Sequence, residues 1–262
     1  METSLAAGRT ENVNGIEMYY ETRGEGEPLV LLHGFTGSGA DWGHVFKSTP
    51  DQFRLIIPDL RGHGRSTNPS MQFTFRQSAL DVFALLDRLQ IERFKAIGLS
   101  AGAKTLLHMA TQQPARIEAM VLISATHYFP EQARAIMRQM TVENQPDEQW
   151  QVLRQRHKHG DDQIRALLIQ GNGFKDSFDD MNFTPPYLST IQARTLIVHG
   201  DRDPFYPINI AVEMRSAIPR SYLWVVPNGG HGPIFAELMG SGETSDHFVE
   251  TALRFLRGEW EH

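Results

Sequence analysis

The stretch that most constrains the fold of this chain runs from Phe94 to Ala110, where an apolar run enters a glycine-rich corner and leaves as an amphipathic helix. The corner, residues 98–102, reads Gly-Leu-Ser-Ala-Gly and places Ser100 between a strand and a helix. A serine at such a corner is forced towards positive φ, and small residues two positions before and after it avoid backbone clashes. The helix also directs free N–H groups and its positive dipole end at Ser100, which favours a site that stabilises negative charge.

Short apolar runs alternate with helix-like stretches on both sides of this corner. The first two runs flank Asn14-Gly15, a dipeptide that favours a type I′ turn and predicts a β-hairpin. Wholly apolar runs further along are typical of strands that are buried on both faces of a sheet. The predicted strands cover residues 10–13, 16–22, 28–32, 53–57, 94–98, 117–124, 195–199 and 222–226. Repeated strand–helix units predict a parallel, doubly wound sheet whose ligand site lies beyond the carboxyl ends of its strands.

The alternation stops between residues 125 and 189, where no convincing apolar strand is found. We interpret this segment as a helical insertion into one core domain that consists of residues 1–124 and 190–262. Helix-like stretches within the insertion cover residues 130–142, 147–158 and 161–169. Outside it, further predicted helices cover residues 41–48, 74–89, 207–217 and 246–257.

Composition excludes several classes of site and partner. The chain has no cysteine, so disulfides, thiolate metal sites and cysteine nucleophiles are excluded. Its net charge of -6 argues against nucleic acid and anionic membrane surfaces as partners. The first residues are polar, without the apolar segment of a signal peptide, and no later run approaches membrane-spanning length. We therefore expect a soluble, cytoplasmic monomer or homodimer that acts on a small molecule.

The loops after the last two predicted strands carry further reactive residues. The seventh strand leads into Asp201 and Asp203, and the eighth leads into His231. A serine hydroxyl is a poor nucleophile without a base, and the base needs a third group that orients it and stabilises its protonated form. Ser100, His231 and Asp203 can fill these three roles, in the chain order nucleophile, acid, histidine. Asp201 is the alternative acid.

These motifs resemble those of the α/β-hydrolase superfamily, and the resemblance covers nearly the whole chain. Besides the corner, the matching segments are the turn His33-Gly34-Phe35, the loop 59–66 and the acid loop 200–203. The resemblance implies an α/β-hydrolase fold, with a mostly parallel eight-stranded doubly wound sheet and a helical cap formed by residues 125–189. It also implies that Asp203 carries the catalytic carboxylate and that His231 is the catalytic histidine. Ala103 stands where relatives often have a second glycine, which concerns helix packing rather than catalysis.

A reaction follows from this assignment. The backbone N–H groups of Phe35 and Ala101 are the expected oxyanion donors. Ser100 attacks a carbonyl carbon while His231 takes its proton, and a water activated by His231 then hydrolyses the acyl-enzyme. No cofactor and no metal are implied. Residues 157–159 read His-Lys-His, but residues two apart on a helix do not share a face, so we expect a solvated surface there and not a metal site.

The predicted function is hydrolysis of a carboxylic ester or lactone of a small apolar substrate. The serine at the corner argues against the dehalogenases and epoxide hydrolases of this fold, which use aspartate there. Two alternatives remain open: a carbon–carbon bond hydrolase of the meta-cleavage-product type, and a ligand-sensing receptor with slow turnover. We expect the cap to lie above Ser100 and to select the substrate. Its apolar candidates for substrate contact are Phe129, Trp150, Phe174 and Phe178.

Overall fold

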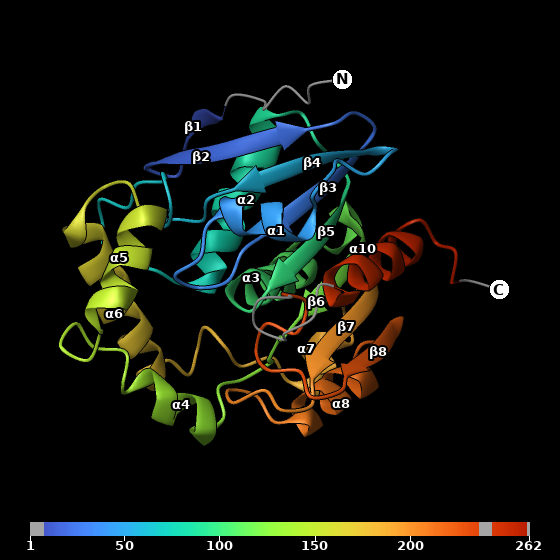
Figure 1. The fold of residues 1–262 in the computed structure, drawn as a ribbon. Coiled ribbons are helices and arrows are strands. Elements are labelled where there is room, and N and C mark those ends of the chain that lie inside the picture. The colour runs from blue at the N-terminus through green and yellow to red at the C-terminus, as the bar shows by residue number, and fades with distance from the viewer. Residues whose placement is uncertain (1–7, 236–242, 261–262) are drawn as a thin grey trace.

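The computed structural model describes residues 8–235 and 243–260, and within them eight strands form one sheet (Figure 1). The strands are β1 (Arg9–Val13), β2 (Ile16–Arg23), β3 (Glu27–Leu32), β4 (Phe53–Pro58), β5 (Phe94–Leu99), β6 (Ile117–Ile123), β7 (Arg194–Gly200) and β8 (Ser221–Val226). Their order is β1-β2-β4-β3-β5-β6-β7-β8, in which β2 is antiparallel to β1 and β4 and every other pair is parallel. The prediction of a mostly parallel eight-stranded sheet is confirmed.

The sheet begins with the predicted hairpin. Val13 pairs with Ile16, and the two residues between them, Asn14 and Gly15, have φ of 44° and 77°. Positive φ at both central positions defines the type I′ turn that the Asn-Gly dipeptide favours. The turn at Asn14 and Gly15 therefore explains why β1 pairs with β2 in the antiparallel direction.

Helices cover both faces of the sheet (Figure 1). These are α1 (Trp42–Val45), α2 (Phe75–Arg88), α3 (Ala101–Gln112), α8 (Ile208–Ala217) and α10 (Glu243–Leu256), with short 3₁₀ helices η1 (Gly39–Asp41) and η2 (Pro114–Arg116). Val30 and Leu32 of β3 pack in a core with α2, α3 and α8, whereas Leu29 and Leu31 pack in a second core with α1 and α10. This alternation explains why β3 is apolar on both faces. None of the helices in the described part combines the length and the apolar character that crossing a bilayer requires.

Between β6 and β7 all the named elements are helices. They are α4 (Glu131–Met137), α5 (Asp147–Arg156), α6 (Asp161–Gly173), the 3₁₀ helix η3 (Phe174–Asp176) and α7 (Pro185–Leu188). The three predicted helical stretches correspond to α4, α5 and α6, whereas η3 and α7 were not predicted. Figure 1 shows α4, α5 and α6 on the side of the sheet towards which β5 and β7 point. Leu153, Ile164 and Leu168 form a small core of their own in this segment.

A histidine after α5 differs from the sequence prediction for residues 157–159. Helix α5 ends at Arg156, and His157 is buried, with 2% of its surface exposed. Its Nδ1 accepts a hydrogen bond from the N–H of Gly64 at 2.9 Å, and its Nε2 donates to the carbonyl of Thr36 at 3.1 Å. The expectation of a solvated surface is therefore wrong for His157, because a helical pattern does not reveal a contact with distant loops. The other two residues of the group are exposed, as expected.

The corner at residues 98–102 has the backbone that its sequence predicts. Ser100 has φ of 49° and ψ of -102°. A Cβ on Gly98 would lie 2.6 Å from the carbonyl carbon of Gly102, and a Cβ on Gly102 would lie 2.5 Å from the carbonyl carbon of Leu32. Both glycines are required because β3, β5 and the first turn of α3 touch through their backbones.

Substitution of Gly102 tests this contact. We expect Gly102→Ala to lower the free energy of unfolding by at least about 1–3 kcal/mol, the usual cost of overpacking, because the added methyl meets backbone that cannot rotate away. Gly173→Ala is the matched control: this glycine ends α6, and a Cβ there would meet no heavy atom within 4 Å. Urea denaturation should show the control to be neutral or stabilised by up to about 1 kcal/mol. Equal stability of the two variants would contradict the close contact.

Candidate active site

The loops at the carboxyl ends of β5, β7 and β8 bring Ser100, Asp203 and His231 together. Ser100 is the N-cap of α3, Asp203 follows β7 and His231 follows β8. The Oγ of Ser100 lies 2.8 Å from Nε2 of His231. Nδ1 of the same ring lies 2.9 Å from Oδ2 and 3.0 Å from Oδ1 of Asp203. The imidazole therefore links the serine hydroxyl to a carboxylate.

Asp203 is buried, and hydrogen bonds stabilise its charge. Its Oδ1 accepts from the N–H groups of Phe205 and Tyr206 at 2.8 and 3.2 Å. Burial favours the neutral carboxyl group, but the bonds from His231 and the two amides outweigh it and hold the pKa of Asp203 below its ordinary value. An ionised carboxylate only accepts, so Nδ1 of His231 donates and Nε2 is left to accept from the Ser100 hydroxyl.

Asp201, the alternative acid of this loop, is exposed. Its N–H donates to the carbonyl of Val226 at 3.2 Å, which joins the loops after β7 and β8. The same loops cross at Gly200, where a Cβ would overlap the carbonyl of Gly229. The close contact of these loops brings Asp203 to His231, which lies 28 positions further along the chain. The carboxylate that contacts the imidazole is therefore that of Asp203 and not that of Asp201.

The backbone N–H groups of Phe35 and Ala101 are the two predicted oxyanion donors. Neither has a hydrogen-bond acceptor among the residues that the structure describes. Ala101 is the first residue of α3, where helix geometry offers its N–H no partner. His33 braces the turn that carries Phe35: its Nδ1 donates to the Gly34 carbonyl at 2.7 Å, and its Nε2 accepts from the Leu60 N–H at 2.9 Å. Burial lowers the pKa of His33, which favours the neutral ring that this pair of bonds requires.

Ser100 and His231 line a cavity of about 290 Å³, here called the Ser100 pocket. Its walls are largely apolar. Met137, Met140 and Phe174 contribute to them from the segment between β6 and β7. This segment therefore supplies part of the surface that a molecule bound at Ser100 would contact.

The four aromatic residues that were predicted to contact substrate occupy different environments. Phe174 lines the Ser100 pocket, and Phe129 is buried with its ring centroid 6.0 Å from that of Phe174. Trp150 packs against the small core between α5 and α6. Phe178 is 64% exposed, and the guanidinium of Arg134 lies 3.9 Å from its ring centroid. Phe174 is thus the one of the four that lines the pocket. Phe129, Trp150 and Phe178 do not line it, contrary to the prediction, because apolar character alone does not separate a pocket wall from other packing.

Lys104, which was not predicted from the sequence, also lines the Ser100 pocket. This residue lies one turn beyond Ser100 on α3, and its Nζ donates to the hydroxyl of Tyr206 at 2.9 Å. A sequence signal was available, since Lys104 is the single Lys, Arg, Asp or Glu between residues 96 and 112. A single charged residue in an otherwise uncharged stretch beside Ser100 indicates that its side chain has a specific partner.

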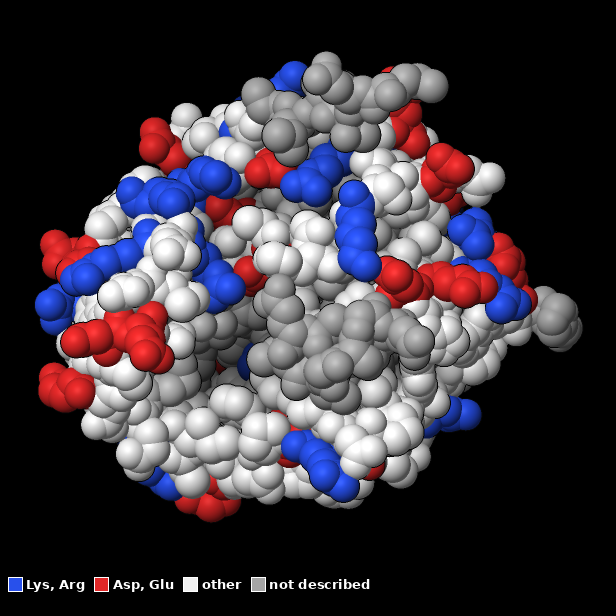
Figure 2. Space-filling model, viewed as in Figure 1, with Lys and Arg blue, Asp and Glu red and all other residues white. Residues whose placement is uncertain are grey.

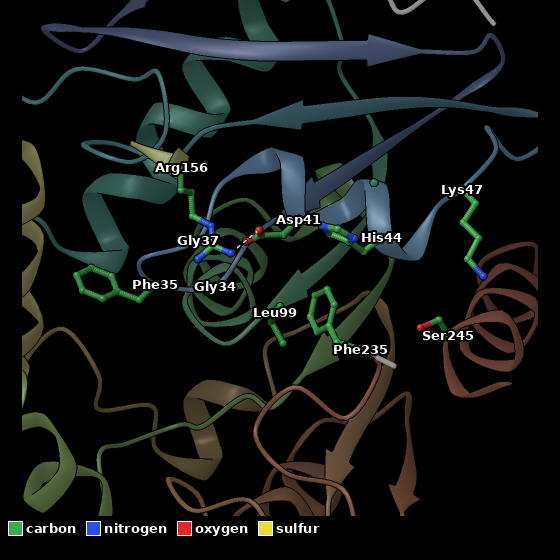
Figure 3. A pocket seen from close by; sticks show the side chains of 11 residues that line it. Gly34, Phe35, Gly37, Asp41, His44, Lys47, Leu99, Arg156, Phe235 and Ser245 are labelled. Atoms are coloured by element: carbon green, nitrogen blue, oxygen red, sulfur yellow. Dashed lines mark ion pairs between the residues drawn. The ribbon is translucent and has the colours of Figure 1, made fainter. Parts of the chain in front are cut away.

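A larger hollow of about 550 Å³, here called the outer pocket, adjoins the Ser100 pocket (Figure 3). The lining residues that the two share are Gly34, Phe35, Leu99 and Phe235. In Figure 3, Arg156 at the end of α5 and Asp41 of η1 point toward each other at the outer pocket, as an ion pair of 3.0 Å. Figure 2 shows the same face of the molecule hollowed beside α5 and α6. Within the described residues, no three His, Asp or Glu side chains are grouped as metal ligands.

Comparisons with known proteins agree with this fold. A family model described as alpha/beta hydrolase fold matches residues 27–141. The serine hydrolase BPHL of Mus musculus is 29% identical over 228 residues, which are 84% of this chain and 78% of that protein. The 2-hydroxy-6-oxo-6-phenylhexa-2,4-dienoate hydrolase of Comamonas testosteroni is 25% identical and covers 97% of this chain and 99% of its own. The solved structure of carboxylesterase CesB (YbfK) from Bacillus subtilis aligns with a TM-score of 0.77 at 21% identity, over 97% of this chain and 92% of that chain.

The matches and the molecule itself lead to the same classification. The mostly parallel eight-stranded sheet, the strand–serine–helix corner and the turn after β3 are features that the family resemblance implied, and each is present. The family model over residues 27–141 and the solved structure agree that this chain has the α/β-hydrolase fold.

Proposed function

We propose that this chain is a serine hydrolase that cleaves a carboxylic ester or lactone of a small apolar substrate through an acyl-enzyme. The observation that carries the proposal is the pair of hydrogen-bonded contacts from Ser100 through His231 to Asp203. Similarity to the serine hydrolase BPHL and to the carboxylesterase CesB supports this class of reaction. None of the steps below needs a cofactor.

Acylation uses the proton path at the site. As Ser100 Oγ bonds to the carbonyl carbon, its proton moves to Nε2 of His231, 2.8 Å away. The imidazolium that forms is stabilised by the ionised Asp203 at Nδ1. Negative charge develops on the carbonyl oxygen, and the unused N–H groups of Phe35 and Ala101 are the donors for it. The tetrahedral adduct then collapses, and His231 gives its proton to the departing alcohol oxygen.

Deacylation repeats these steps with water. His231, neutral again, takes a proton from a water molecule that attacks the acyl carbon, and the same two N–H groups receive the second oxyanion. Collapse returns the proton to Ser100 and releases the acid. The largely apolar Ser100 pocket, with Met137 and Phe174 on its wall, suits a small apolar acyl group during both steps.

Ser100→Ala in the hydrolysis of p-nitrophenyl butyrate tests this function. We expect the wild-type protein to release nitrophenol over many turnovers. The variant should lose about 10⁶-fold in kcat, the scale on which a lost nucleophile slows a serine protease, with an unchanged melting temperature.

Retained activity in the folded Ser100→Ala variant would place the nucleophile elsewhere. Wild-type protein that releases one equivalent and then stops would favour the receptor alternative. Preference for a vinylogous diketone over every ester would favour the carbon–carbon bond hydrolase.

A second experiment separates the two aspartates of the acid loop. Asp203→Asn should lower kcat by about 10⁴-fold, because an amide at this position no longer holds His231 in the tautomer that accepts the serine proton. Asp201→Asn is the matched control and should stay near the wild-type rate, since its side chain is exposed. Steady-state kinetics with p-nitrophenyl butyrate measure both. The opposite ranking would assign the acid role to Asp201.

A further inference from the structure

Lys104 lies beside the proposed nucleophile and takes no part in the steps described above. Its backbone N–H donates to the carbonyl of Ser100 at 2.9 Å. Lys104 is 3% exposed, yet it lines the Ser100 pocket together with Ser100 and His231. A buried ammonium group is costly unless it is paired with an anion or fully hydrogen-bonded. Its place at the wall of a reactive pocket therefore needs a physical reason.

Aromatic groups surround the Nζ atom of Lys104. It donates to the hydroxyl of Tyr206 at 2.9 Å. It also lies 4.7 Å from the ring centroid of Phe75, 5.1 Å from that of Phe129 and 5.4 Å from that of Tyr206. An ammonium group carries three N–H donors and no acceptor. Within the described part of the chain, one of these donors has a hydrogen-bond acceptor and two have none.

The charged groups around Lys104 do not neutralise it. Burial lowers the pKa of Lys104 to about 7, although Asp203 after β7 and Asp180 after η3 favour the charged form. Asp203 is engaged by His231, and Asp180 accepts hydrogen bonds from two backbone N–H groups at the start of α2. The guanidinium of Arg134, on α4, faces one of the same aromatic rings and adds no negative charge. Among the described residues, no carboxylate forms an ion pair with Lys104.

On the basis of the proposed hydrolase function, we propose that Lys104 binds a carboxylate at the end of the acyl group remote from the scissile carbonyl. The preferred substrate is then an ester of a dicarboxylic acid with a short apolar stem, which refines the apolar acyl group proposed above by giving its far end a charge. Met137, Met140 and Phe174 suit the stem, and the carboxylate accepts the two remaining N–H donors. The acyl group stays on Ser100 after the alcohol leaves, so we assign it to the Ser100 pocket and the alcohol to the outer pocket.

The test compares two esters that differ at one position. Mono-p-nitrophenyl adipate carries a carboxylate where p-nitrophenyl hexanoate carries a methyl group. We expect the wild-type protein to prefer the adipate in kcat/KM, with uncatalysed hydrolysis subtracted. In Lys104→Met, which keeps the length of the side chain and removes its charge, the adipate-to-hexanoate ratio should fall by about tenfold to a hundredfold, the range for hydrogen bonds to charged groups.

Lys175→Met is the matched control. This lysine belongs to η3, next to Phe174, but its Nζ donates to Oδ1 of Asn172 at 2.7 Å and it does not line the Ser100 pocket. Removing its charge should leave the adipate-to-hexanoate ratio at the wild-type value.

A pH profile of the wild-type protein tests the same inference without a variant. The ratio of the two kcat/KM values cancels the ionisation of His231, which both substrates need equally. Lys104 is charged below its pKa and neutral above it, so the ratio should fall as the pH rises through about 7. The carboxylate of the adipate stays ionised over this range.

The outcomes separate this inference from the proposed function. The role of Lys104 is overturned if the protein hydrolyses the hexanoate but the adipate-to-hexanoate ratio is the same in the wild-type and Lys104→Met proteins. It is also overturned if that ratio does not change with pH. Either result leaves the hydrolase function standing. Wild-type protein that hydrolyses neither ester overturns both. A lower ratio in Lys104→Met together with the fall above pH 7 supports the carboxylate site.

Discussion

The contact of three backbones at the strand–helix corner determines where the rest of the site must be. Gly98 lies against Gly102, and Gly102 lies against Leu32 of β3, so α3 starts directly after β5 with no intervening loop. Ser100 is held at φ of 49°, a conformation that costs about 1–3 kcal/mol and persists only where the surroundings enforce it. Buried strands on both sides supply that enforcement. The sheet thus fixes the position of the Ser100 hydroxyl, and the loops after β7 and β8 bring His231 and Asp203 to it.

Asp203 and Lys104 are two buried ionisable groups near this hydroxyl, and they differ in how well hydrogen bonds stabilise their charges. Asp203 receives hydrogen bonds from His231 and two backbone amides, which hold its pKa below the ordinary value despite burial. Lys104 donates one hydrogen bond, to the hydroxyl of Tyr206, and its Nζ otherwise lies near aromatic rings. Burial lowers the pKa of Lys104 to about 7. In the proposed mechanism Asp203 stays ionised through each turnover, and its hydrogen bonds suit that role. The proposed substrate carboxylate would supply the hydrogen-bond acceptors that Lys104 lacks.

Local sequence rules predicted the fold and the corner because those features depend on neighbouring residues. Asn14-Gly15 defines a turn, apolar runs define buried strands, and the glycines around Ser100 define a close approach. The walls of the pocket depend on tertiary contacts that no local pattern records. Phe174 and Phe178 are four positions apart and equally apolar, yet one lines the pocket and the other is 64% exposed. The buried position of His157 was missed for the same reason.

Covalent labelling measures whether Ser100 is a nucleophile that His231 activates. A fluorophosphonate should react with one serine per chain, because its phosphorus accepts the activated Oγ as fluoride departs. Trypsin releases the corner as peptide 96–104, in which Ser100 is the single hydroxyl-bearing residue. Intact-mass and peptide mass spectrometry should find one phosphonyl group, on that peptide. A label on any other peptide, or no label on folded protein, would mean that Ser100 is not the activated nucleophile.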